Sequence, residues 1–164
     1  MKYALITGAS RGIGRAVALS LAEQYSIIIN YHSNSQAAQD VKQEIEANGG
    51  YAELLPFDVS DPKAIEGAVD AWEAAHPNEF ISVLVNNAGI RRDNVMFMMS
   101  NEDWHGVLDT NMNGFFYLTR RLLKHMMPRK HGGRIVNMTS LSGLKGMPGQ
   151  VNYSAAKAAL IGAT

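Results

Sequence analysis

The sequence has no cysteine among its 164 residues. That absence excludes a disulfide framework, a thiolate metal site and a cysteine nucleophile, and it fits a reducing compartment such as the cytoplasm. The chain also has no charge surplus, because 15 basic residues balance 15 acidic ones. Nucleic-acid binding rests on a basic surplus, so we expect no nucleic-acid partner. No apolar run approaches the roughly 18 residues of a membrane span and no signal peptide is recognised, so we expect no membrane partner.

Short apolar segments alternate with helical patterns along the chain. The apolar segments cover residues 3–7, 26–30, 52–57, 82–86 and 134–138. Several are apolar at consecutive positions, as strands buried on both faces are. Between them, apolar residues recur with helical spacing. This alternation predicts an α/β fold in one domain, a Rossmann-type doubly wound parallel sheet with helices on both faces.

Two helical patterns lead to specific expectations. Ile13, Val17 and Leu21 step by four, which puts them on the buried face of the first helix. The apolar pattern over residues 104–127 predicts one long helix, and Ser100 is a candidate cap for its start.

A glycine-rich loop joins the first strand to the first helix, with the pattern G-x-x-x-G-x-G. Glycine permits a tight turn and close backbone approach to a pyrophosphate, and a helix N-terminus offers free N–H groups to an anion. The alternative is a tight turn that binds nothing. Arg11 places a fixed cation beside the expected phosphate. The candidate cofactor-binding residues of this loop are Gly8, Ser10, Arg11, Gly12, Ile13 and Gly14.

The second strand ends without the acidic residue that binds both ribose hydroxyls of NAD. The chain has no carboxylate there until Asp40. An acid would repel a 2′-phosphate, whereas Arg11 and nearby hydroxyl groups attract it. The sequence therefore predicts NADP(H) as the cofactor. The candidate contacts after this strand are Asn30, Tyr31 and Ser33.

Tyr153 and Lys157 stand four residues apart, which places a phenol and an ammonium on one face of a helix. The cation favours the phenolate form and makes the tyrosine a candidate acid–base catalyst. Ser140 follows the fifth strand, where parallel sheets bind ligands, and its hydroxyl is a candidate to hold a substrate carbonyl. Capping of the loop is the alternative for that hydroxyl, and Thr139 or Ser142 could take its place.

Amide side chains add a further candidate. Asn111 faces the apolar side of its helix, because it lies four residues after Val107 and four before Phe115. A buried amide needs partners, so structural hydrogen bonding and a catalytic role are equally open for it. The segment 86–89, Asn-Asn-Ala-Gly, follows the fourth strand and suits close approach to a cofactor ribose, or merely an ordered turn.

Together these motifs resemble the short-chain dehydrogenase/reductase family, and within it the chain is most similar to the β-ketoacyl-acyl-carrier-protein (3-oxoacyl) reductases. The segments that carry the family resemblance are residues 7–14 and 86–89, Asn111, Ser140, and Tyr153-x-x-x-Lys157. The narrower likeness rests on residues 90–94, 104–111 and 146–150. The resemblance implies NADPH-dependent reduction of a 3-oxoacyl thioester, linked to acyl carrier protein or CoA, in fatty acid biosynthesis. Other carbonyl or alcohol substrates, and NADPH binding without catalysis, are the alternatives.

The resemblance also implies residue roles and no metal. The implied catalytic residues are Asn111, Ser140, Tyr153 and Lys157. Tyr153 would protonate the carbonyl oxygen, Lys157 would hold the nicotinamide ribose, and Asn111 would hold a water that leads to Lys157. The further implied cofactor-binding residues, beside Tyr153 and Lys157 themselves, are Asp58, Val59, Asn87, Ala88 and Gly89.

Family members run to roughly 250 residues as one domain. The resemblance therefore implies that residues 1–164 form an incomplete NADP-binding Rossmann domain, with C-terminal strands and helices missing from this sequence. It also implies a homo-oligomer, dimer or tetramer, through the long helix. Arg129, Lys130 and His131 lie where related reductases meet acidic carrier protein, which predicts electrostatic docking there.

Overall fold

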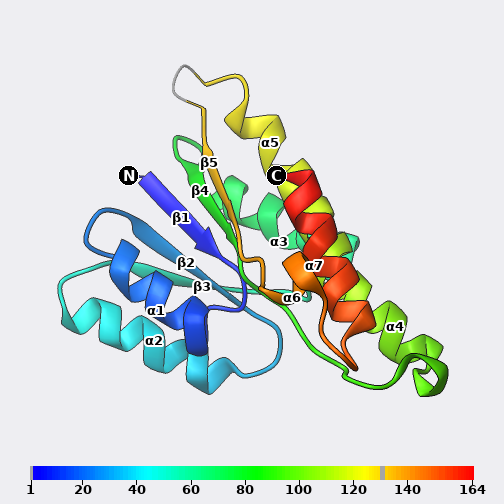
Figure 1. The fold of residues 1–164 in the computed structure, drawn as a ribbon. Coiled ribbons are helices and arrows are strands. Elements are labelled where there is room, and N and C mark those ends of the chain that lie inside the picture. Colours follow the sequence, from blue (N-terminus) through cyan, green and yellow to red (C-terminus); the bar gives the residue numbers. More distant parts are fainter. Residues whose placement is uncertain (1, 130–131) are drawn as a thin grey trace.

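The computed structural model describes residues 2–129 and 132–164. Its strands form one parallel sheet in the order β3-β2-β1-β4-β5 (Figure 1). The strands are β1 (Lys2–Ile6), β2 (Ser26–Tyr31), β3 (Ala52–Pro56), β4 (Phe80–Asn86) and β5 (Arg134–Asn137). They coincide with the predicted apolar segments, apart from small shifts at the ends. The predicted Rossmann-type sheet is confirmed.

Helices cover both faces of this sheet. They are α1 (Gly12–Leu21), α2 (Ser35–Ala47), α3 (Pro62–Ala75), α4 (Asn101–Leu108), α5 (Gly114–Met126), α6 (Ser142–Lys145) and α7 (Val151–Ala163). A 3-10 turn, η1 (Met96–Met98), precedes α4, and a π-helical segment, η2 (Asp109–Asn113), joins α4 to α5. Figure 1 shows α1 and α2 side by side on one face, away from α3 and α5. Within the described residues, no helix is both long and apolar enough to span a membrane.

Successive side chains along the strands pack alternately into two separate hydrophobic cores, one on each face of the sheet. Tyr3 and Leu5 of β1 belong to the core that also holds buried residues of α3 and α5. Ala4 and Ile6 belong to the core under α1 and α2. Apolar side chains at consecutive strand positions are therefore buried on opposite faces, which is the arrangement that the unbroken apolar runs predict.

The long helix predicted over residues 104–127 is widened in its middle by the π-helical segment. Asn111 lies in this segment, and its Nδ2 donates hydrogen bonds to the carbonyl oxygens of Val107 and Ile90, both at 2.9 Å. A side chain that takes over a backbone acceptor locally opens the helical turn. Ser100 caps the start of α4, as predicted, by accepting a hydrogen bond from the Asp103 N–H at 3.0 Å.

The prediction that Ile13 lies on the buried face of α1 is wrong. Its side chain is 62% exposed, and the buried residues of the helix are Gly14 and Ala18. The small residues of α1 face the sheet, so the helix backbone approaches the strands closely. Ile13 is left at the carboxyl edge of the sheet, beside the candidate site.

The strand order reverses between β1 and β4. The chain runs outward from β1 to β2 and β3 and then returns to β4 on the other side of β1. The loops after β1 and β4 therefore leave neighbouring strand ends in different directions. Crevices at such reversal points are where open parallel sheets bind ligands.

The basic segment predicted to dock carrier protein is described only in part. The Arg129 guanidinium lies 3.8 Å from the ring centroid of Phe80, and its Nε donates to the carbonyl of His125 at 3.1 Å. Lys130 and His131 lie outside the described residues. The docking prediction therefore remains a prediction.

Candidate active site

Thr7, directly after β1, ties together the two loops at the reversal point. Its hydroxyl accepts hydrogen bonds from the N–H groups of Asn87 and Ala88, both at 2.9 Å. The Asn87 side-chain amide in turn donates to the carbonyls of Thr7 at 2.8 Å and Gly8 at 3.3 Å. These bonds fix residues 86–89 against the glycine loop. Sequence reasoning missed Thr7, although a hydroxyl at the end of a buried strand was a usable signal.

The glycine loop has the shape and the donors that an anion requires. Gly8 and Gly12 adopt positive φ angles of 62° and 55°. A side chain at Gly14 would overlap with the Gly8 carbonyl oxygen and would lie 2.5 Å from Nδ2 of Asn87. Among the described residues, no side chain caps the N–H groups at the start of α1, and Arg11 stands at the cap position. These N–H groups fit a pyrophosphate, and the half-buried Ser10 lies in the same loop.

Asn30, near the end of β2, supports the glycine loop through a hydrogen bond to its backbone. Its side chain is buried, and its Oδ1 accepts a hydrogen bond from the Gly8 N–H at 3.2 Å. Both amide hydrogens go to the carbonyls of Leu55 and Phe57, each at 3.1 Å. Asn30 therefore has no donor left for a phosphate and acts by positioning the loop. Beyond it, the half-buried Tyr31 and the exposed Ser33 are the hydroxyl-bearing candidates.

Asp58 and Val59 point to different places after β3. Asp58 is half-buried, and its Oδ1 accepts hydrogen bonds from the N–H and hydroxyl of Ser60 at 2.8 and 2.7 Å. Its Oδ2 lies 3.7 Å from Nε2 of His32, at the end of β2. Val59 belongs instead to the core under α5, where a side chain at Gly114 would lie 3.0 Å from its Cβ. Asp58 is thus at the carboxyl edge of the sheet, whereas the Val59 side chain packs inside.

Tyr153 and Lys157 lie together on α7, as their spacing predicts. The ammonium of Lys157 is 5.6 Å from the ring centroid of Tyr153 and donates a hydrogen bond to the carbonyl of Met138 at 2.6 Å. Lys157 is only 3% exposed. Burial lowers the pKa of its ammonium group below the ordinary lysine value, because the protein interior disfavours the charged form. The fold thus places the Lys157 side chain next to the ring of Tyr153.

An open cleft brings these elements together at the carboxyl edge of the sheet. The described residues that line it are Ile13, Asn87, Gly89, Ile90, Arg91, Met138, Thr139, Tyr153 and Lys157. Of the predicted residues, the cleft brings together Ile13 of the glycine loop, Asn87 and Gly89 after β4, and Tyr153 and Lys157 of α7. Ile90, Arg91 and Met138 were not predicted as site residues, although residues 90–94 carry the narrower likeness.

Ser140 is placed next to this cleft rather than among its lining residues, where Thr139 stands. The Ser140 hydroxyl oxygen accepts a hydrogen bond from the Ser142 N–H at 3.2 Å. This bond is the loop-capping interaction that the sequence left open. The same oxygen retains its own hydrogen to donate to a ligand.

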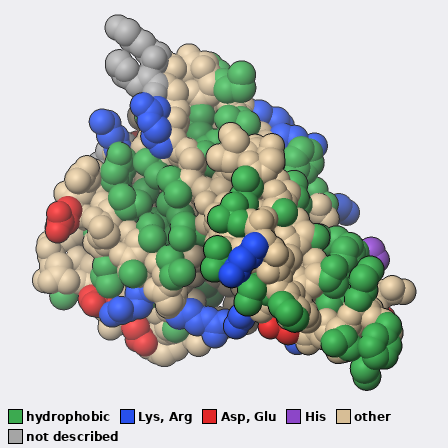
Figure 2. All heavy atoms as spheres, viewed as in Figure 1, with side chains coloured by type: hydrophobic (Ala, Val, Ile, Leu, Met, Phe, Trp, Pro, Cys, Tyr) green, Lys and Arg blue, Asp and Glu red, His purple; other side chains and the backbone are tan. Residues whose placement is uncertain are grey.

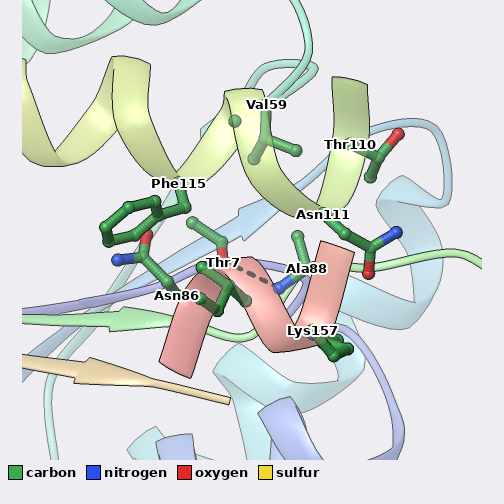
Figure 3. A pocket seen from close by; sticks show the side chains of 10 residues that line it. Thr7, Val59, Asn86, Ala88, Thr110, Asn111, Phe115 and Lys157 are labelled. Atoms are coloured by element: carbon green, nitrogen blue, oxygen red, sulfur yellow. Dashed lines mark hydrogen bonds between the residues drawn. The ribbon is translucent and has the colours of Figure 1, made fainter. Parts of the chain in front are cut away.

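A smaller pocket lies behind the cleft, and Lys157 lines both cavities (Figure 3). It has room for about one water molecule. Figure 3 shows Asn111 and Lys157 on facing helices around it. The Oδ1 atom of Asn111 is buried and has no hydrogen-bond partner among the residues that the structure describes. The amide therefore bonds to the helix and to the loop after β4 through its N–H groups and keeps an acceptor for a ligand or water.

Two further amides, not singled out from the sequence, attach α7 to the loop after β4. Asn152 is fully buried and donates hydrogen bonds to the carbonyls of Arg92 at 3.0 Å and Asp103 at 3.2 Å. Gln150 donates to the carboxylate of Asp93 at 2.9 Å. Tyr153 follows directly in the sequence, so these bonds set the position of its helix relative to that loop.

Comparisons with known proteins agree with this geometry. The family model described as short chain dehydrogenase matches residues 2–164. A 3-oxoacyl-acyl-carrier-protein reductase from Synechocystis is 46% identical over 164 residues, which are 99% of this chain and 65% of the relative. The reductase of the same name from Escherichia coli K12 is 41% identical over 161 residues, covering 98% of this chain and 64% of the relative.

A solved structure has a closely similar fold. The crystal structure of a provisionally named gluconate dehydrogenase from Agrobacterium tumefaciens superposes with a TM-score of 0.94 at 34% identity. The match covers 99% of this chain and 63% of that one. The chain thus spans a little less than two thirds of the length of the relatives it matches.

Proposed function

We propose that this chain, which belongs to the short-chain dehydrogenase family, forms the NADP-binding Rossmann domain, residues 1–164, of a 3-oxoacyl thioester reductase. The observation that carries the proposal is the single cleft shared by Tyr153, Lys157 and the loop with Asn87 and Gly89. The names of relatives at 41–46% identity support the thioester substrate and a role in fatty acid biosynthesis. Because the chain spans about 65% of those relatives, the activity is proposed for the whole protein.

In the proposed reaction, Tyr153 donates its hydroxyl proton to the carbonyl oxygen of the substrate. The bound nicotinamide cofactor supplies the hydride to the carbonyl carbon. Lys157 stabilises the phenolate left on Tyr153 and contacts the cofactor ribose, together with residues 87–89. Ser140 orients the carbonyl by donating its hydroxyl hydrogen, and Asp58 binds the adenine end. The uncapped N–H groups of α1 and Arg11 hold the pyrophosphate.

Asn111 is proposed to hold a water that returns protons to the site. Its buried Oδ1 lacks a partner among the described residues, and the pocket between it and Lys157 has room for about one water molecule. A water bound there reaches the side chain of Lys157 from behind the cleft. The proton given up by Tyr153 is then replaced through Lys157 and this water.

NADPH is the proposed cofactor because the end of β2 carries no carboxylate. Tyr31 ends this strand, Ser33 lies just beyond it, and Arg11 adds a cation from the neighbouring loop. A 2′-phosphate is attracted by such a set, whereas NADH gains nothing from it. Asn30 supports this subsite only indirectly, through the loop that it holds.

The proposed partners follow from the surface of α5. Phe116 is 47% exposed on this helix, and the Arg120 guanidinium lies 4.9 Å from its ring centroid. An exposed aromatic ring of this kind suits a contact with another copy, so a homodimer or homotetramer is proposed. The proposed substrate is attached to acyl carrier protein or CoA, and the proposed location is the cytoplasm, which suits a chain with no cysteine.

A panel of substrates and cofactors tests the proposal on the full-length protein. We expect oxidation of NADPH that depends on acetoacetyl thioester and is at least about tenfold more efficient, in kcat/KM, than with NADH. Such a ratio corresponds to about 1.4 kcal/mol from the 2′-phosphate contacts. A keto sugar acid and a simple ketone complete the panel. Higher efficiency with NADH, or turnover of the sugar acid alone, would refute the proposal.

A further inference from the structure

The cleft contains a cation that the proposed reaction does not use. Arg91 lines the cleft together with Tyr153, and its side chain is exposed. No ion pair found among the described residues involves Arg91. Figure 2 shows basic side chains beside the hollow to which the carboxyl ends of the strands lead.

The other positively charged side chains near the cleft already have a partner or a proposed role. Lys157 is buried and donates to the carbonyl of Met138. Arg11 stands at the start of α1, next to the N–H groups that suit a pyrophosphate. Among the described lining residues, Arg91 is therefore the exposed cation that faces the remaining space of the cleft.

The loop that carries Arg91 is attached firmly to α7. Asn152 holds the carbonyl of Arg92, and the N–H of Asn94 donates to the carbonyl of Gly149 at 2.8 Å. The carboxylate of Asp93, the acid nearest in sequence, accepts a hydrogen bond from Gln150. The backbone of Arg91 is therefore held at a defined place relative to Tyr153. The backbone of this loop therefore loses little freedom when the Arg91 guanidinium binds an oxyanion.

We propose that Arg91 forms an anion subsite of the cleft, which binds an oxyanion group of the substrate, either a phosphate or a carboxylate. The guanidinium fork matches both groups with two parallel hydrogen bonds. This inference rests on the proposed function, because it says where the charged part of the reduced substrate lies. It predicts that substrates of equal carbonyl chemistry are distinguished by their charge.

The test compares Arg91→Gln with Arg92→Gln in the full-length protein. Arg92 is the matched control, because it is the neighbouring exposed arginine and does not line the cleft. The substrates are acetoacetyl-CoA, which carries phosphates, the neutral acetoacetyl-N-acetylcysteamine thioester, and a keto sugar acid, which carries a carboxylate. We expect Arg91→Gln to lower kcat/KM for an anionic substrate by about 10- to 100-fold, as for a lost hydrogen bond to a charged group.

The neutral thioester identifies the cause of any loss. Arg91→Gln should change its kcat/KM by less than about twofold, Arg92→Gln should change neither substrate class, and Arg91→Lys should recover part of the loss. A loss confined to acetoacetyl-CoA identifies the phosphate, and a loss confined to the sugar acid identifies the carboxylate. Equal losses with neutral and anionic substrates, or no loss with any, would overturn the subsite.

A binding measurement separates this inference from the proposed function. If the wild-type protein reduces the sugar acid and neither thioester, the thioester function fails, while the Arg91→Gln comparison is still read on the sugar acid. If it reduces none of them, the dissociation constants of acetoacetyl-CoA and of the sugar acid are measured in the presence of NADPH. A rise of about tenfold or more for either ligand in Arg91→Gln, and not in Arg92→Gln, supports the subsite. Unchanged constants refute it.

Discussion

Replacing Tyr153 by phenylalanine is expected to lower kcat for the acetoacetyl thioester by about 10²- to 10⁴-fold, the usual contribution of a positioned general acid. The substitution removes only the hydroxyl oxygen, and the ring stays beside Lys157, whose ammonium is 5.6 Å from the ring centroid. The dissociation constant of NADPH should therefore change little. Steady-state kinetics and fluorescence titration with NADPH measure the two effects separately.

Tyr25→Phe is the matched control for this experiment. Tyr25 is half-buried just before β2, at the opposite end of the sheet from the cleft. It loses the same oxygen atom and should keep kcat within about twofold of wild type. Retained turnover in Tyr153→Phe would remove the tyrosine from the proposed mechanism. Equal losses in both variants would point to a general effect of the substitution.

Replacing Gly14 by alanine is expected to damage the glycine loop itself. The added methyl group would overlap with the Gly8 carbonyl oxygen and press on the Asn87 amide, which already bonds to that loop. Overpacking of this kind costs about 1–3 kcal/mol. We expect the free energy of unfolding to fall by that amount and the dissociation constant of NADPH to rise by about tenfold or more.

Gly67→Ala shows what the same change does where there is room. Gly67 lies within α3, and a side chain there meets no atom within 4 Å among the described residues. Alanine favours a helix over glycine by up to about 1 kcal/mol, so this variant should be slightly more stable and bind NADPH normally. Chemical denaturation and NADPH titration compare the two. A Gly14→Ala protein that is as stable and binds as tightly as Gly67→Ala would contradict the packing argument.

The fold followed from the sequence where the pattern is purely hydrophobic. Runs such as residues 27–29 are apolar at every position, and the structure buries them on both faces of the sheet. The parallel sheet with helices on both faces followed from strand–helix alternation and the handedness of the crossovers. The π-helical segment did not, because periodicity alone does not reveal that the Asn111 side chain takes the carbonyl of Val107.

The site was predictable where a motif brings its own geometry. Tyr153 and Lys157 share a helix, so four residues of spacing place them together. Asn30 and Val59 show the limit, because their side chains turn into the protein to serve a loop and a core. Arg91 shows a second limit, because it was not predicted and its position depends on distant parts of the chain. Its place in the cleft depends on hydrogen bonds from Asn152 and Gln150, which lie about sixty residues further along the chain.

In the proposed function, this cleft brings a bound nicotinamide to a substrate carbonyl for direct hydride transfer. The most direct test is to react the full-length protein with acetoacetyl thioester and NADPH deuterated at the transferred position of the nicotinamide, and then to weigh the 3-hydroxybutyryl product. The account predicts a product heavier by about one mass unit, with the deuterium on the carbon that bears the new hydroxyl. An unlabelled hydroxy product, or no hydroxy product at all, would contradict it.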